Sequence, residues 1–223
     1  MTEKLNFQHE AVTIIGGAGF SKTDLNECLA HGSTLISADG GANYLDKTRD
    51  KLDYIIGDCD SIKNTKSWVK RGARIIKIEE QETTDFEKCL YSIDATTYFC
   101  IGFMGRRVDH FLSVCSALVK YHYKTVILVG AHDIIFHLPK FFEIDLPLGT
   151  RLSLFPMEKI VGISESGLQW PIAGLEFEPS KRIGTSNKTV ARKVKTTLSN
   201  NGMLSIMPRS SLTDVITALR KHK

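Results

Sequence analysis

The chain has 223 residues, of which 42% are hydrophobic and 24% charged, and it carries a net charge of +4. These proportions are ordinary for one large globular domain or two small ones, and a mild charge whose basic residues are dispersed except at the C-terminal end does not call for nucleic acid as a partner. No apolar run approaches the roughly 20 residues that span a bilayer. The first residues lack the apolar core of a signal peptide.

Five cysteines are present, and none forms a CxxC pair. An odd number of unpatterned cysteines fits a reducing compartment. We therefore expect a cytoplasmic protein without a membrane partner and without a structural metal.

The first two thirds of the chain alternate between short apolar runs and helical segments. The runs that predict strands are 11–15, 34–38, 54–57, 73–78, 97–102, 125–129 and 134–138. Helices are predicted at 22–31 with Ser21 or Thr23 as cap, 42–47, 64–71, 84–93 with Thr84 as cap, and 108–121. This alternation is typical of a parallel sheet with crossover helices.

Near residue 143 the pattern changes to short alternating runs separated by turns. Strands are predicted at 150–155, 160–164, 168–170, 189–197 and 203–207, which indicates an antiparallel sandwich. Ser211 to Asp214 resembles a capping box that opens a last helix, with Leu212, Val215, Ile216 and Leu219 on one face. The predicted fold class is thus an α/β domain with a parallel sheet (1–143) followed by an all-β antiparallel sandwich domain with a C-terminal helix (144–223).

Four polar loops follow or separate the predicted parallel strands, at 38–43, 57–61, 81–85 and 102–110. Parallel strands place their carboxyl ends at one edge, where open α/β sheets bind ligands. We expect the acids, glycines and arginine of these loops to converge there. The Gly16–Gly19 turn after the first strand fits either a close approach to a nucleotide or a simple tight turn.

Two carboxylates, Asp58 and Asp60, lie two residues apart directly after a predicted strand. Residues i and i+2 of an extended segment point to the same side, so both carboxylates could reach one Mg²⁺ ion. An acidic turn is the plain alternative. DxD phosphatases and metal-dependent glycosyltransferases use a similar motif, but such phosphatases place it after their first strand.

Two further pairs lie at predicted helix starts, Gln81 with Asp85 and Arg107 with Asp109. Asp85 fits either a metal site or a favourable interaction with the helix dipole. Arg107 fits either a bidentate phosphate contact or an ordinary surface ion pair with Asp109. His110 fits an orienting or packing role better than that of a base.

Together these loops resemble the signature set of the thiamine pyrophosphokinase family. The matching segments are ADGGAN (38–43), IIGDCDSI (55–62), Gln81-x-x-Thr-Asp85 and Gly105-Arg-Arg-x-Asp-His110, followed by 149–156, 166–171 and 185–187 in the second half. The match runs in the same order through residues 11 to 207. The resemblance implies transfer of a pyrophosphoryl group from ATP to the hydroxyl of thiamine, in a homodimer with shared active sites.

The resemblance also implies residue roles. Asp58, Asp60 and Asp85 would be the magnesium ligands and acids of the phosphate region, while Gln81, Arg107 and Asp109 would position nucleotide phosphates and metal. Substrate binding would also involve Asp39, Gly40, Gly41 and Asn43. Trp170, Ser186 and Asn187 would hold thiamine. Trp170 fits either stacking on the aminopyrimidine or a place as a core aromatic of the sandwich. Asp85 or Asp60 would accept the hydroxyl proton.

Two features depart from the family pattern. Arg106 stands where the family often has a second glycine, and the helix after Pro208 is an addition. A DxD phosphatase and a nucleotide-sensing module without turnover remain the alternative functions.

Overall fold

The computed structural model describes residues 5–46, 48 and 50–221, apart from the side chains of residues 8 and 9. The chain forms two compact units. Unit 1 contains the described residues up to Ala117 together with Val126–Ala131, and unit 2 contains Leu118–Thr125 and the described residues from His132 onward. The predicted boundary at residue 143 stays a prediction.

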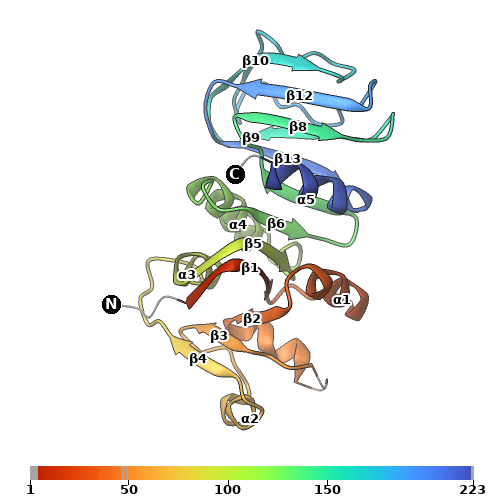
Figure 1. Ribbon diagram of the computed structural model, residues 1–223. Coiled ribbons are helices and arrows are strands. Elements are labelled where there is room, and N and C mark those ends of the chain that lie inside the picture. Colours follow the sequence, from red (N-terminus) through yellow and green to blue (C-terminus); the bar gives the residue numbers. More distant parts are fainter. Residues whose placement is uncertain (1–4, 47, 49, 222–223) are drawn as a thin grey trace. The chain divides into compact units, whose positions relative to one another are not determined.

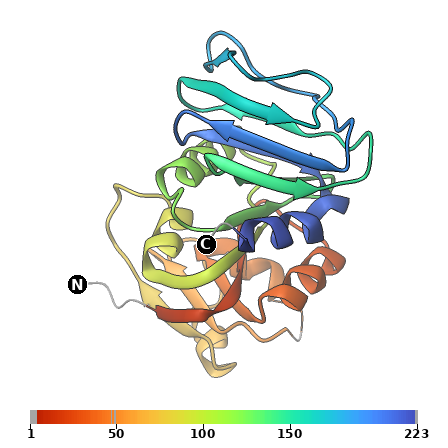
Figure 2. The same ribbon diagram turned by 45° about the horizontal axis from the view of Figure 1, so that its top comes forward.

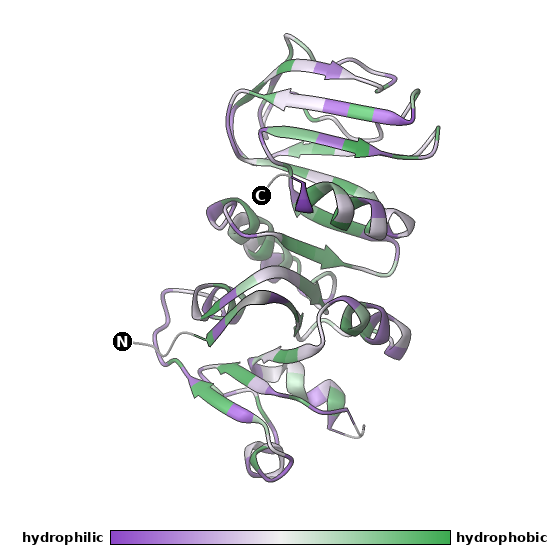
Figure 3. Ribbon diagram, in the orientation of Figure 1, coloured by the Kyte–Doolittle hydropathy of each residue, from purple (hydrophilic) through white to green (hydrophobic). Residues whose placement is uncertain are grey.

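Unit 1 is built on a parallel sheet of six strands in the order β4-β3-β2-β1-β5-β6 (Figure 1). Its strands are β1 (Leu5–Ile15), β2 (Thr34–Ala38), β3 (Tyr54–Gly57), β4 (Arg74–Lys77), β5 (Ile93–Ile101) and β6 (Val126–Val129). The carboxyl-terminal halves of β1 and β5, most of β2 and all of β6 are buried, as expected for a parallel sheet, and β6 appears hydrophobic in Figure 3. The predicted α/β arrangement is confirmed.

Helices connect these strands. They are α1 (Lys22–His31), the 3₁₀ helix η1 (Asp39–Leu45), α2 (Thr65–Lys70), α3 (Asp85–Ser92) and α4 (Val108–Lys120). Ser21 and Thr84 close capping boxes at the starts of α1 and α3, which satisfies helix N–H groups that otherwise lack partners. Both caps were predicted.

The predicted helix at 42–47 is wrong in type and position. A 3₁₀ helix begins three residues earlier, at Asp39, because two glycines disfavour an α-helix in this loop. Lys47, the last residue of the predicted helix, lies outside the described residues.

The order of the strands places a topological switch point between β1 and β5, where the chain leaves the sheet in opposite directions. The backbone loops after these strands touch: the N–H of Ala18 donates to the carbonyl of Gly102 at 2.7 Å. A Cβ atom on Gly16 would lie 2.6 Å from the same carbonyl oxygen, so only glycine fits. The Gly16–Gly19 turn therefore has a packing role, and it opens at the point where doubly wound sheets bind ligands.

The strands of unit 2 form two antiparallel sets, in the orders β7-β13-β9 and β11-β10-β12-β8, of which the second is a separate four-stranded sheet (Figure 2). The strands are β7 (Asp133–His137), β8 (Phe141–Asp145), β9 (Ser153–Pro156), β10 (Ile160–Ser166), β11 (Glu176–Phe177), β12 (Lys193–Leu198) and β13 (Met203–Pro208). In β12, buried and more exposed residues alternate, which is visible as alternating colours in Figure 3. The predicted antiparallel sandwich is confirmed.

Individual strands of unit 2 differ from prediction. β8 and β11 were not predicted, and the segment 168–170 is no strand, because Leu168 forms only an isolated bridge with Thr189. The predicted strand at 189–197 begins only at Lys193. Isolated β-bridges, and not regular strands, connect the segments around residues 168 and 189.

The last helix, α5 (Leu212–Arg220), packs on β8 through its apolar face, which includes the four predicted residues. The predicted capping box at Ser211 is wrong. A short 3₁₀ helix, η2 (Arg209–Ser211), precedes α5 and gives Ser211 a ψ angle of 4°, so its side chain makes no cap hydrogen bond. Among the described residues no helix is long and apolar enough to cross a membrane.

Candidate active site

A pocket of about 850 Å³ opens at the carboxyl edge of the parallel sheet in unit 1. All four predicted loops and the Gly16–Gly19 turn contribute to its lining, so the predicted convergence is found. The predicted site residues that line it are Asp39, Gly40, Gly41, Asn43, Asp58, Gln81, Asp85 and Arg107. Asp60 and Asp109 belong to the same loops but are not among the lining residues.

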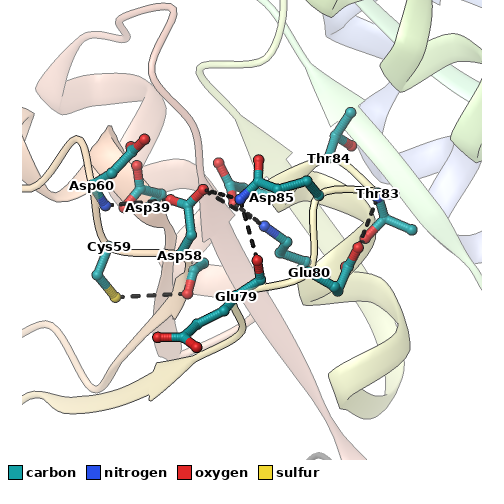
Figure 4. A network of polar contacts seen from close by, with 12 residues as sticks. Asp39, Asp58, Cys59, Asp60, Glu79, Glu80, Thr83, Thr84 and Asp85 are labelled. Carbon is teal, nitrogen blue, oxygen red and sulfur yellow. Dashed lines mark hydrogen bonds and ion pairs between the residues drawn. The ribbon is translucent and has the colours of Figure 1, made fainter.

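Asp39, Asp58 and Asp60 form an acidic cluster at one side of this pocket (Figure 4). One carboxylate oxygen from each residue lies within 4.8 Å of the others. Like charges at this separation repel one another unless a cation lies between them. Oxygen ligands from two or three carboxylates suit Mg²⁺, so the donor set fits that ion.

Asp39 is the most buried member of the cluster. Its side chain is 3% exposed in relative terms, and the Oδ1 atom has no hydrogen-bond partner among the described residues. The Oδ2 atom accepts the backbone N–H of Ser61 at 3.3 Å. Burial raises the pKa of Asp39 above its usual value. A buried carboxylate oxygen without a donor is a place where a cation can bind.

Asp58 is held by a neighbouring loop. The side-chain amide of Gln81 donates to Asp58 Oδ2 at 3.1 Å, and the N–H of Asp60 donates to Oδ1 at 3.3 Å. The hydrogen bond from Gln81 is the main cause that lowers the pKa of Asp58. Asp58 is therefore ionised at neutral pH, and Gln81 fixes the orientation of its carboxylate.

Asp85, the third predicted metal ligand, lies outside the acidic cluster and contacts a lysine. Lys88 follows one turn later on α3, and its Nζ atom lies 3.3 Å from Asp85 Oδ1 and 4.0 Å from Asp58 Oδ2. The Lys88 side chain is only 2% exposed. Burial raises the pKa of Asp85, and Lys88 opposes this rise. Lys88 was not predicted, although its position three residues after Asp85 at a helix start was a usable signal.

Glu80, also not predicted, organises the loop that carries Gln81. Its carboxylate accepts hydrogen bonds from the backbone N–H groups of Glu82 and Thr83 at 2.8 and 3.0 Å, and from the hydroxyls of Thr83 and Tyr91. These donors, with Thr83 first, lower the pKa of Glu80 to about 2. Figure 4 shows Glu80 beside Thr83.

Arg107 and Asp109 form an ion pair with two hydrogen bonds, of 3.2 and 2.6 Å. The hydrogen bonds from Arg107 lower the pKa of Asp109 to about 2. Both side chains are about two thirds exposed, at 66% and 65%. The pair has the geometry of a surface ion pair, and a phosphate contact by Arg107 stays a prediction.

Strained backbone coincides with the predicted loops. Among the described residues, the non-glycine residues with positive φ are Asp39, Cys59, Arg106 and Ser186, at 36°, 67°, 50° and 63°. Each lies in or next to a loop predicted to bind ligand. Such conformations cost on the order of 1–3 kcal/mol each and tend to cluster at functional sites.

Unit 2 contains a second pocket, of about 510 Å³, lined by Trp170, Ser186 and Asn187 together with apolar neighbours. Trp170 is 52% exposed, so it is not a core aromatic. Asn187 is buried, and its amide group bonds the backbone of Trp170. The three predicted thiamine residues are thus gathered in one place.

Two family models match the chain. Residues 25–129 match the model described as "Thiamin pyrophosphokinase, catalytic domain", and residues 139–204 match "Thiamin pyrophosphokinase, vitamin B1 binding domain". The first model covers the 850 Å³ pocket almost entirely, and the second covers the 510 Å³ pocket.

Curated relatives and solved structures agree with these models. The chain is 27% identical to "Thiamine pyrophosphokinase 1" of Arabidopsis thaliana over 74% of each chain, and 25% identical to "Thiamin pyrophosphokinase 1" of Caenorhabditis elegans over 77% of each. Its fold is similar to that of yeast thiamin pyrophosphokinase (TM-score 0.78, 18% identity, covering 95% and 93% of the two chains). The enzyme from Candida albicans is similar too, with a TM-score of 0.77, 19% identity and coverage of 92% and 93%.

Proposed function

The chain belongs to the thiamin pyrophosphokinase family, and on that premise we propose that it transfers a pyrophosphoryl group from ATP to the hydroxyl of thiamine, giving thiamine diphosphate and AMP. The observation that carries this proposal is the acidic cluster of Asp39, Asp58 and Asp60 beside a nucleotide-sized pocket at the switch point of the sheet. ATP brings about four negative charges to this acidic edge, which requires a cation between the carboxylates and the phosphates.

Mg²⁺ fits this cluster, and Asp39, Asp58 and Asp60 are the residues that would hold it. The unpartnered, buried Oδ1 atom of Asp39 supports the assignment. When bound, the ion would neutralise charge on the phosphate oxygens. The assignment replaces Asp85 by Asp39 in the predicted ligand set. Asp85 keeps the other two roles predicted for it, an acid of the phosphate region and an acceptor for the hydroxyl proton.

In the transfer, the thiamine hydroxyl oxygen forms a bond to the β-phosphorus of ATP. The bond between that phosphorus and the oxygen bridging to the α-phosphate breaks, and AMP leaves with the electron pair. The hydroxyl proton passes to a carboxylate. Such reactions depend on positioning and charge neutralisation more than on covalent catalysis. Gln81 and Glu80 serve positioning here, since Gln81 holds the Asp58 carboxylate and Glu80 holds the loop that carries Gln81.

We place thiamine against Trp170 in the 510 Å³ pocket. The exposed indole offers a flat surface on which the aminopyrimidine ring can stack. Asn187 fixes the segment that carries the indole. Ser186 lies on the same pocket wall and offers a hydroxyl group for the polar edge of the ligand.

We further propose a cytoplasmic homodimer in which subunits share active sites. Val108 and Leu112, one turn apart on α4, are 72% and 58% exposed and form an apolar strip that a second copy would cover. All five cysteines are free, as in a reducing compartment. Leu112→Lys should shift the mass in sedimentation from dimer to monomer, and an unchanged mass would place the interface elsewhere.

One assay tests the proposed function. Purified protein is incubated with Mg²⁺, ATP and thiamine, and AMP and thiamine diphosphate are quantified together. We expect equal amounts of the two products and no AMP without thiamine. Inorganic phosphate release without thiamine would instead support a phosphatase, and ATP binding without any product would support a nucleotide sensor.

A further inference from the structure

Arg106 occupies a backbone conformation that favours glycine. Its φ angle is 50°, in the left-handed region, which is sterically unfavourable for an L-residue other than glycine. The family whose motifs this loop resembles often has glycine at the position. The backbone conformation of Arg106 is therefore unfavourable for arginine, which suggests that its side chain has a function.

The side chain of Arg106 joins three loops at the carboxyl edge of the sheet. Its Nη1 atom donates to the hydroxyl of Tyr44 at 2.8 Å, and that hydroxyl donates to the carbonyl of Gly17 at 3.0 Å. Tyr44 belongs to η1 after β2, Gly17 follows β1, and Arg106 follows β5. Tyr44 also packs against Phe20, with ring centroids 5.7 Å apart. Arg106 is therefore oriented by a neighbour that is itself fixed.

Arg106 also differs in its charge balance from Arg107 and Lys88, two other cations that line the pocket. Arg107 is paired with Asp109, and Lys88 is paired with Asp85. Among the described residues no carboxylate forms an ion pair with Arg106, and its Nη1 atom donates to the neutral hydroxyl of Tyr44. Arg106, Tyr44 and Gly17 all line the 850 Å³ pocket. An uncompensated guanidinium thus borders the space proposed for ATP.

We propose that Arg106 is a nucleotide-binding residue particular to this chain, which contacts a phosphate oxygen of ATP while Tyr44 holds the guanidinium in place. The inference rests on the proposed function in that it takes ATP as the ligand. A guanidinium has five N–H donors, and Tyr44 accepts only one of them, which leaves donors for a bidentate phosphate contact. Arg106 would supply positive charge from the 102–110 loop, whereas the acidic cluster lies on the 38–43 and 57–61 loops.

The test is equilibrium binding of ATP with Mg²⁺ and without thiamine, measured by calorimetry on the full chain. Arg106→Gly removes the guanidinium and the strain together. We expect its Kd for ATP to rise about tenfold, in line with the loss of a charge-assisted hydrogen bond on a partly exposed site. Its melting temperature should not fall. Tyr44→Phe should raise Kd about two- to threefold, and have no further effect in the Arg106→Gly background.

Two controls separate a phosphate contact from other effects. Lys66→Gln removes the same charge from exposed α2, outside the pocket, and should leave Kd unchanged. Adenosine lacks phosphate, so it should bind wild type and Arg106→Gly equally. An equal loss of adenosine binding would overturn the phosphate contact.

Wild-type ATP affinity in Arg106→Gly would overturn the proposal for Arg106 alone, provided that the variant still forms AMP with thiamine. Absence of ATP binding to the wild type, together with absence of AMP formation, would overturn the proposed function as well. Parallel measurement of binding and turnover therefore distinguishes the two failures.

Discussion

The side chain of Asn187 makes hydrogen bonds to both backbone groups of Trp170. Its Oδ1 atom accepts the N–H of Trp170 at 3.1 Å, and its Nδ2 atom donates to the carbonyl of Trp170 at 2.7 Å. The two residues are 17 positions apart, and the buried amide satisfies both backbone groups of Trp170 next to the isolated bridge between Leu168 and Thr189. The exposed indole is thereby presented from a fixed backbone.

Asn187→Ala should weaken both the fold and thiamine binding. Two backbone groups of Trp170 lose their partner, so the free energy of unfolding should fall by about 1–3 kcal/mol. The KM for thiamine should rise with it, because the indole loses its fixed orientation. Denaturant unfolding and steady-state kinetics measure the two effects. Asn200→Ala is the control, because the Asn200 amide donates to the Lys159 carbonyl at 3.2 Å and accepts the Ser199 hydroxyl at 2.6 Å, away from Trp170; equal effects of the two substitutions would contradict the positioning role.

The two tryptophans should respond in opposite ways to substitution by alanine. Trp170→Ala removes an exposed stacking surface, so we expect the thiamine KM to rise about tenfold, equal to about 1.4 kcal/mol, at little cost in stability. Trp68→Ala removes a side chain that is 1% exposed and should cost about 3–5 kcal/mol of unfolding free energy. A stable Trp170→Ala protein with unchanged thiamine KM would show that thiamine binds elsewhere.

Asp58→Asn and Asp60→Asn should weaken cation binding without unfolding the protein. Each removes one charged ligand from the acidic cluster and also removes repulsion between carboxylates, so melting temperatures should hold or rise. The Kd for Mn²⁺, read by electron paramagnetic resonance in the absence of nucleotide, should rise about tenfold or more. Asp145→Asn on the exposed end of β8 should change nothing. Unaltered Mn²⁺ affinity in both cluster variants would refute the metal site.

Glu80 should make the stability of the protein depend on pH in the acid range. The pKa of Glu80 falls from 4.5 to about 2 in the fold. A lowered pKa means that its contribution is fully present above pH 4.5 and is lost as pH falls toward 2. After discounting for solvent screening, we expect about 1 kcal/mol from this carboxylate. The free energy of unfolding should therefore change less between pH 6 and pH 2 in Glu80→Gln than in the wild type.

The neighbouring Glu79 is the control for that comparison. Its side chain is 76% exposed and, among the described residues, bonds only Lys77, so Glu79→Gln should follow the wild-type pH curve closely. Identical curves for Glu80→Gln and the wild type would mean that the carboxylate does not hold the loop.

Most of unit 1 was predictable because its signals are local. Strands such as β2 and β3 match their predicted bounds residue for residue, since each is an apolar run between a turn and a polar loop. The convergence of the four loops followed from parallel topology alone. The family resemblance then gave roles to Asp58, Gln81 and Asp85 that spacing alone left open.

The remaining features depend on contacts between distant residues. β1 and β5 are longer than predicted because Leu5 pairs with Ile93 across the sheet, which no local pattern reveals. The grouping of Asp39 with Asp58 and Asp60 depends on Gly57, where a Cβ atom would lie 2.7 Å from the Asp39 Cβ atom. The sequence shows the glycine but not the neighbour that requires it.

Lys88 gives the last prediction, because it is a nearly buried cation whose partner is partly exposed. Lys88→Met keeps an unbranched side chain of similar length but leaves Asp85 without its ion pair, and Asp85 is 36% exposed. The loss of unfolding free energy should therefore be about 1–3 kcal/mol, below the value for a fully buried pair. Asp85→Asn in the same chain removes the unpaired charge, so the double variant should recover much of that loss. A double-mutant cycle by denaturant unfolding measures the coupling, expected at about 1 kcal/mol or more. Lys120→Met is the control for the loss of a lysine charge, because Lys120 lies at the exposed end of α4 and does not line the pocket. Strictly additive effects of the Lys88 and Asp85 substitutions would show that the two residues are near one another without stabilising one another.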